Sequence, residues 1–139
     1  MKFVYASVIA FVLISCGKKT AEQIPLLNGY WEIEHVTLAD GTKKQYSVNT
    51  VVDFIEVNGL IGIRKKMMPQ PDGTFKTTNQ TETFAISTGN GELRLQYKTP
   101  FDQWIETVLE LDDQKLVVKN EAGNTYHYKR FQPLSLNNE

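Results

Sequence analysis

Short turn signals recur along this chain, and they restrict its fold more than any other feature of the sequence. Asn-Gly and Asp-Gly pairs supply the positive φ angles that tight hairpin turns need. The runs between them are rich in Val, Ile, Thr, Tyr, Phe and Trp, the usual composition of strands. No run after Cys16 carries a long helical stripe, so the pattern predicts an all-β chain. The turn signals are Asp40-Gly41, Asn58-Gly59, Asp72-Gly73, Gly89-Asn90-Gly91, Asp112-Asp113 and Gly123-Asn124.

Alternation within the runs indicates which side chains face the core, because successive strand residues point to opposite faces. Leu93, Leu95 and Tyr97 share one face of their run. Ile105 and Leu109 share the apolar face of the next run. We expect Glu106 and Glu110 on the opposite, solvent-exposed face. We expect strands at 29–38, 43–47, 50–57, 60–66, 74–78, 81–88, 92–98, 103–111, 115–119 and 125–131.

The short loops determine how these strands pair. Parallel pairs need a crossover of about a dozen residues, so strands joined by tight turns are antiparallel. A row of about eight to ten short strands has two exposed edges, and closing the row into a barrel removes them. A sandwich of two packed sheets is the alternative arrangement that deals with the exposed edges. We predict a small up-and-down antiparallel barrel.

Composition excludes several classes of protein. A chain of 139 residues fits one domain. The 15 basic residues are balanced by 16 acidic ones, which gives no basic excess for binding nucleic acid. The single cysteine, Cys16, rules out an intrachain disulfide and a zinc site built on several thiolates.

The N-terminus has the pattern of an export signal. Lys2 precedes an uncharged apolar run, 3–14, which is too short to span a bilayer core of about 20 residues. The run ends in Leu13-Ile14-Ser15-Cys16, which resembles the lipobox of bacterial lipoproteins. This resemblance implies cleavage after Ser15 and a diacylglycerol on the Cys16 sulfur. We therefore expect a signal peptide over 1–15, then a lipidated cysteine and tether over 16–26.

The same resemblance implies a location. We expect the protein to be anchored by its lipid in the bacterial cell envelope, at the outer membrane and facing the periplasm. Display on the cell surface stays open.

The two ends of the predicted sheet carry a second resemblance. The first strand opens with Gly29-Tyr30-Trp31, and Arg130 lies in the last. A Gly-x-Trp entry with a late basic residue resembles the lipocalin and wider calycin barrels. The resemblance implies that Trp31 closes the base of the barrel and that Arg130 packs across its ring, which requires the first and last strands to be neighbours. It covers 27–131 as the barrel domain and leaves 132–139 as a tail. The chain also resembles short lipocalin-like lipoproteins of bacterial envelopes.

No motif of the sequence predicts catalysis. There is no Gly-x-Ser-x-Gly elbow, no Cys–His pair, no glycine-rich phosphate loop and no calcium-loop ladder. Alternation predicts that His35 points into the barrel and His127 away from it, so the two histidines do not predict a metal site. We expect no enzyme, no cofactor and no metal.

Two kinds of binding surface are predicted instead. An interior ligand site needs apolar lining residues, and a docking surface needs exposed apolar side chains near loops. Each pair of docking candidates has an alternative role. The two methionines could instead fold over the barrel mouth as a lid, and the two aromatic residues could instead cap the core. The candidate lining residues are Leu93, Leu95, Tyr97, Ile105 and Leu109, and the candidate docking residues are Met67, Met68, Phe101 and Trp104.

Two functions follow from these expectations. The first is a non-enzymatic, lipid-anchored barrel that binds a small apolar ligand or a partner protein. The second is a structural accessory subunit with a filled barrel, docked on an outer-membrane protein complex. An inhibitor of a periplasmic or host enzyme rests on analogy of fold alone.

Overall fold

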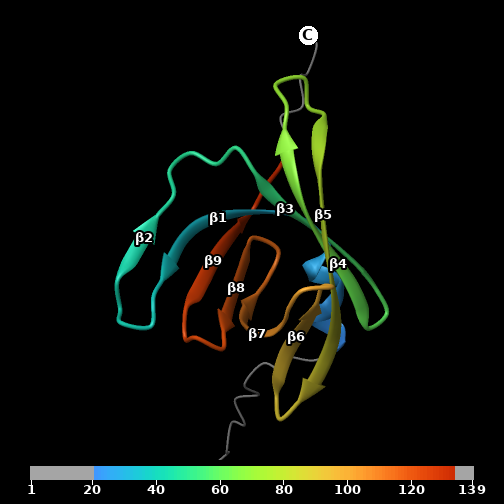
Figure 1. Cartoon of the computed structure of the whole chain (residues 1–139), viewed down its shortest axis with the longest axis vertical. Coiled ribbons are helices and arrows are strands. Elements are labelled where there is room, and N and C mark those ends of the chain that lie inside the picture. The colour runs from blue at the N-terminus through green and yellow to red at the C-terminus, as the bar shows by residue number, and fades with distance from the viewer. Residues whose placement is uncertain (1–20, 134–139) are drawn as a thin grey trace, which may run out of the picture.

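The computed structural model describes residues 21–133, which form one closed antiparallel sheet with a short helix at one end (Figure 1). Tight turns join nearly all successive strands, as the sequence predicts. The elements are the 3₁₀ helix η1 (Ala21–Leu27) and the strands β1 (Gly29–Thr37), β2 (Lys43–Gln45), β3 (Val52–Asn58), β4 (Ile61–Pro69), β5 (Phe75–Gly89), β6 (Glu92–Lys98), β7 (Gln103–Leu111), β8 (Lys115–Asn120) and β9 (Thr125–Arg130).

The sheet closes through its first strand. The start of β1 pairs with β3 on one edge, and the other edge of β1 pairs along its length with β9. Eight strands, β1 and β3 to β9, therefore form the barrel, while the short β2 pairs only with the far end of β1. Closure removes the sheet edges that a sandwich of the same strands leaves exposed. The predicted all-β, up-and-down antiparallel barrel is confirmed.

The plug at the base of the barrel consists of η1, Trp31 and Arg130. Ile24 and Leu27 of η1 are buried beneath Trp31, whose indole nitrogen donates a hydrogen bond of 2.9 Å to the Leu27 carbonyl. The guanidinium carbon of Arg130 lies 3.8 Å from the centroid of the Trp31 ring. The described part of the tether predicted over 16–26, residues 21–26, thus belongs to η1, with Ile24 in the core.

Arg130 also explains the glycine of the signature. Its guanidinium donates hydrogen bonds to the carbonyls of Asn28 at 2.6 Å, Leu26 at 2.9 Å and Asp113 at 3.0 Å. A Cβ on Gly29, whose φ is +122°, would lie 2.8 Å from this guanidinium. Only glycine fits both the backbone angle and the close approach.

The hairpin of β4 and β5 differs from the prediction. A register shift after Lys65 lets both strands continue past the barrel, so β4 ends at Pro69 and β5 is one strand of 15 residues. We call the distal part, Met67–Thr77, the arm; it extends beyond the barrel in Figure 1. Met67 and Met68 therefore lie half-buried in a strand, and the prediction that this strand ends at residue 66 is wrong.

Aromatic rings hold the arm against the outer wall. The Phe75 ring stacks on that of Tyr30 with centroids 4.4 Å apart, and Phe131 meets Phe75 edge-on at 6.2 Å. Tyr30 in turn contacts Phe54, at 5.0 Å. Each such pair contributes about 0.5–1.5 kcal/mol beyond its buried area.

The predicted inward face is right for β6 and wrong for β7. Leu93, Leu95 and Tyr97 are fully buried, but Ile105 and Leu109 are 36% and 40% exposed on the outer wall. The cause is cross-strand register, because Leu95 lies opposite Glu106, and the inward glutamate forces its neighbours outward. A bulge between Val108 and Glu110 then brings Leu111 back into the core.

A bulge also overturns the prediction for the histidines. The register shifts between Ile33 and His35, so Val36 is buried in the barrel and His35 points outward. Its ring stacks on that of His127, with centroids 4.0 Å apart and planes 19° from parallel. The predicted opposite faces are wrong, because one extra residue exchanges the two faces of a strand.

Residues 21–133 contain neither a cluster of metal ligands nor a membrane-spanning helix. No group of three or more His, Cys, Asp or Glu residues in this part of the chain has the arrangement of a metal site. No helix in it is long and apolar enough to span a membrane. The predicted lipidation site, Cys16, lies outside the described residues.

Candidate ligand-binding cup

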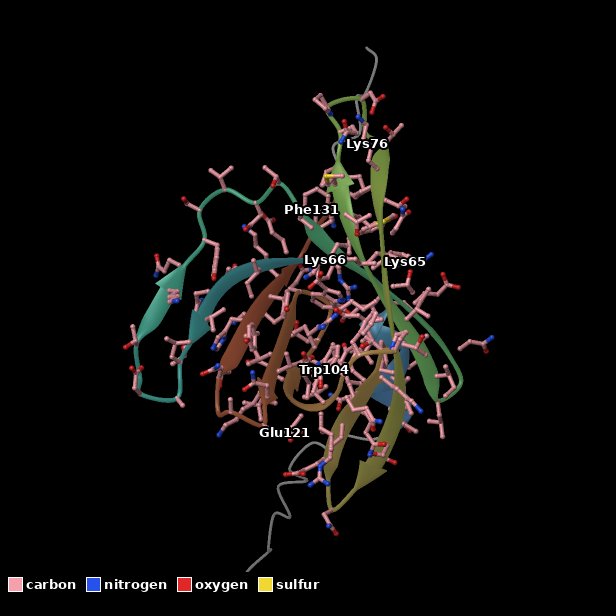
Figure 2. All side chains as sticks on the ribbon, in the orientation of Figure 1. Lys65, Lys66, Lys76, Trp104, Glu121 and Phe131 are labelled. Carbon is pink, nitrogen blue, oxygen red and sulfur yellow. The ribbon has the colours of Figure 1, made fainter. Side chains whose placement is uncertain are left out.

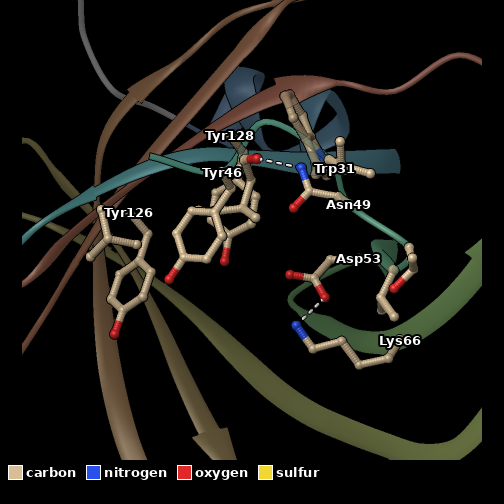
Figure 3. A pocket seen from close by; sticks show the side chains of 12 residues that line it. Trp31, Tyr46, Asn49, Asp53, Lys66, Tyr126 and Tyr128 are labelled. Carbon is tan, nitrogen blue, oxygen red and sulfur yellow. Dashed lines mark hydrogen bonds and ion pairs between the residues drawn. The ribbon is translucent and has the colours of Figure 1, made fainter. Parts of the chain in front are cut away.

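A cavity of about 400 Å³ opens along β1 from Trp31 towards Val36, on the side away from η1 (Figure 3). We call it the cup. Its volume falls within the range of about 300–1,000 Å³ typical of small-molecule sites. The wall is mainly apolar and aromatic, with a few polar groups. The cup is lined by Trp31, Ile33, Val36, Tyr46, Val48, Asn49, Thr50, Val51, Asp53, Lys66, Tyr126 and Tyr128.

The connection between β2 and β3, residues 46–51, forms one side of the cup. The Asn49 amide nitrogen donates hydrogen bonds to the Ile33 carbonyl at 2.9 Å and to the Glu32 carboxylate at 3.2 Å. The backbone nitrogen of Tyr46 donates to the Glu34 carbonyl, also at 2.9 Å. These bonds fix the connection to β1, so this wall has a defined position.

Three tyrosines line the opposite side of the space from Asp53. Tyr126 and Tyr128 are two residues apart on β9 and therefore point to the same face, into the barrel. Tyr46 comes from the connection, and the residue is 45% exposed at the opening. Figure 3 shows the carboxylate of Asp53 directed towards these rings.

An ion pair forms the floor. Asp53 of β3 lies opposite Lys66 of β4 in the sheet, and the Lys66 ammonium nitrogen is 2.5 Å from Asp53 Oδ1. This buried oxygen thus has an ion pair but no hydrogen-bond donor. The Asp53 side chain is 5% exposed and that of Lys66 is 43% exposed. The carboxylate is therefore the buried partner, and the ammonium group reaches water.

Beneath the cup lies a second, much smaller space, which we call the lower chamber. It shares Trp31, Asp53 and Tyr128 with the cup but has a volume of about 10 Å³. A space of this size holds about one water molecule. Side chains therefore fill the lower half of the barrel, and any ligand of ordinary size occupies the cup alone.

A buried charge cluster surrounds the lower chamber. Arg64 lies 2.6 Å from a carboxylate oxygen of Glu82 and 3.4 Å from one of Glu106, and its guanidinium carbon is 4.4 Å from the centroid of the Tyr97 ring. Burial raises the pKa of Glu106, and the positive charge of Arg64 opposes this rise. Burial also raises the pKa of Tyr97 and Tyr128, which keeps both phenols neutral. The Tyr97 hydroxyl is buried without a hydrogen-bond partner.

The predicted ligand-lining residues do not line the cup. Leu95 and Tyr97 border the lower chamber, and Leu93 is packed in the core. Ile105 and Leu109 lie on the outer wall, as described above. The sequence did contain a signal for the actual lining, because Tyr126 and Tyr128 share a face with Arg130 and hence with the interior.

The predicted docking residues are dispersed. Phe101, at the tip of the turn between β6 and β7, is 97% exposed. Trp104 stacks on Tyr97 with ring centroids 5.0 Å apart, so it covers the core, as in the alternative reading. Met67 and Met68 belong to the arm (Figure 2 places their neighbours Lys66 and Lys76). The methionines and the two aromatic residues thus belong to different hairpins.

Comparison with solved structures identifies the fold. A lipocalin-like protein from Bacteroides uniformis is 18% identical, matches 76% of this chain and 99% of its own, and superposes with a TM-score of 0.50. The chain folds as a lipocalin-like barrel. The predicted resemblance is thereby confirmed for the fold.

Two further solved structures resemble this barrel. An uncharacterized protein from Bacteroides eggerthii is 11% identical over 76% of this chain and 99% of its own, with a TM-score of 0.48. Lobster apocrustacyanin A1 is 16% identical over 84% of this chain and 68% of its own, with a TM-score of 0.49. No family model and no curated protein matches the sequence.

Proposed function

We propose that this lipocalin-like protein binds a small, largely apolar ligand in the cup. The observation that carries the proposal is the open cavity of about 400 Å³ with an apolar and tyrosine-lined wall. Such a site, with few polar groups at defined positions, has the size and composition of ordinary small-molecule sites. Lipocalin-like barrels are also typically non-enzymatic binding proteins.

The cup favours this function over the predicted accessory subunit with a filled barrel. Only the lower half of the interior is filled. One observation keeps protein docking as a second candidate: Phe101 in the turn before β7, and Ile105 and Leu109 on the outside of β7, are exposed at intervals of four residues. A partner protein seated on this stripe would leave the cup free.

A cavity-filling variant tests the proposal. Ile33→Trp places an indole in the cup, whereas Leu109→Trp adds the same side chain to the outer wall. We expect the neutral dye N-phenyl-1-naphthylamine to fluoresce with the purified full chain and with Leu109→Trp, and to lose most of that signal with Ile33→Trp. The matched variant corrects for any dye taken up by detergent. Equal fluorescence of the two variants would contradict binding in the cup.

We further propose that the barrel is anchored in the bacterial envelope by lipid on Cys16. The support is the apolar run that ends at the only cysteine, followed at once by polar residues. Metabolic labelling with an alkyne fatty acid should mark the wild-type chain and not Cys16→Ala. A label that persists on Cys16→Ala would refute the anchor and leave the binding function unaffected.

A further inference from the structure

The polar floor of the cup shows which kind of ligand fits there, if the proposed binding function holds. Asp53 is almost completely buried, yet Oδ1 has no hydrogen-bond donor, and within residues 21–133 the one cation that forms an ion pair with it is the ammonium group of Lys66. A buried carboxylate oxygen that has an ion pair but no hydrogen bond is less well compensated for the loss of water than one that has both. The floor therefore offers an unmet acceptor to whatever occupies the cup.

The two members of the ion pair differ in how easily they can be displaced. Asp53 sits on a short side chain inside β3, whereas Lys66 has a long stem and 43% of its side chain reaches solvent. A lysine ammonium group returns to water readily by rotation of its four-carbon stem. A ligand cation can thus replace Lys66 at the carboxylate, and the floor stays neutral.

An anionic ligand meets the opposite situation. Pairing with Lys66 would leave Asp53 buried and unpaired beside a second negative charge, which is strongly unfavourable. Arg64, the other interior cation, is already engaged by Glu82 and Glu106. The interior therefore holds no further cation to receive an anion.

The wall facing Asp53 also suits a cation. Tyr46, Tyr126 and Tyr128 bring their rings to the cup, and Figure 3 shows them across the space from the carboxylate. The faces of aromatic rings attract cations, and they also stack with an aromatic body. One carboxylate below and several phenol rings beside it together match an ammonium group attached to an apolar or aromatic body.

We propose that the ligand class of the cup is a primary amine with a small apolar or aromatic body. Its ammonium group displaces Lys66 and donates hydrogen bonds to Asp53, and its body lies among the three tyrosines. Lys66 acts as an internal stand-in that neutralises Asp53 while the cup is empty.

Three ligands of nearly equal size test this assignment: 2-phenylethylamine, 2-phenylethanol and 3-phenylpropionate. In calorimetric titrations of the purified full chain, we expect the amine to bind roughly tenfold or more tightly than the alcohol, the usual scale for a hydrogen bond to a charged group. The propionate should bind most weakly. Equal affinity for amine and alcohol, or preference for the propionate, would overturn the amine assignment and leave the cup function standing. If no ligand of the set binds and the naphthylamine dye also fails, both proposals fall.

Two substitutions distinguish the partners. Asp53→Asn should remove the preference for the amine over the alcohol. Lys66→Met should tighten amine binding several-fold, because the competing internal cation is gone. Lys65→Met is the matched control: Lys65 precedes Lys66 on β4 and leaves the strand in a different direction, so amine binding should not change (Figure 2). If Lys66→Met instead weakens amine binding, the displacement proposal is wrong. Lys66→Met therefore tests the displacement proposal even if Asp53→Asn does not fold.

Discussion

The base of the barrel and the cup treat their polar groups in opposite ways. At the base, the Trp31 indole and the Arg130 guanidinium donate every described hydrogen bond to a carbonyl of the chain, and the two side chains cover each other. At the cup, Asp53 Oδ1 lacks a donor. Satisfied groups stabilise a fold, whereas unsatisfied buried groups mark positions where a ligand adds what the chain lacks. Closure of this barrel and binding by it therefore depend on different polar groups, although Trp31 borders both regions.

Removing the indole at the base should have the largest effect. We expect Trp31→Ala to lower the free energy of unfolding by about 3–5 kcal/mol, because a fully buried ring is lost and Arg130 loses its stacking partner. Urea denaturation followed by circular dichroism measures this change. Val48→Ala, on an 84% exposed cup residue, should cost little. If the two variants lost comparable free energy of unfolding, the claim that the base stabilises the fold more than the cup does would be contradicted.

Glu106 should have an intermediate and pH-dependent effect. Glu106→Gln should cost about 1–2 kcal/mol, because Arg64 keeps its pair with Glu82. Burial raises the pKa of Glu106 above the ordinary value of 4.5, so the folded state retains this proton more strongly than the unfolded chain. The stability advantage of the wild type over the variant should therefore be greatest below pH 4.5 and shrink as the pH rises. An advantage that grows with pH would contradict this burial.

The smallest effect should come from the stacked histidines on the outer wall. Burial and then the positive charges of His127 and Lys43 lower the pKa of His35, and Glu34 opposes them. A histidine with a lowered pKa in the folded state binds its proton better when unfolded. The wild type should therefore lose melting temperature as the pH falls below about 6.5, and His127→Gln should reduce that loss. An unchanged pH profile in the variant would show that the stacked rings do not interact.

Much of this fold is predictable from the sequence, because closure depends on local signals. Tight turns fix antiparallel neighbours, and the family resemblance carried by Gly29, Trp31 and Arg130 implies that the first and last strands meet. The face of Leu93, Leu95 and Tyr97 also follows from alternation alone, since β6 pairs without a bulge.

The candidate site was less predictable, for two physical reasons. Single-residue bulges in β1 and β7 exchange inward and outward faces, and a count of alternation cannot place them. Alternation also assigns charges to the wet face, whereas Asp53, Lys66 and Glu106 point inward because the barrel pairs them with partners from other strands. The pairing of distant residues is a property of the closed sheet.

Mapping the contact surface of a bound ligand tests the central claim most directly. We would record backbone amide resonances of the full chain during titration with 2-phenylethanol, whose binding does not depend on the charge of the ligand. The account predicts shifts that concentrate on β1 near Ile33, on the connection 46–51 and on β9 near Tyr126 and Tyr128. Shifts confined to the outside of β7, around Phe101, Ile105 and Leu109, would contradict it.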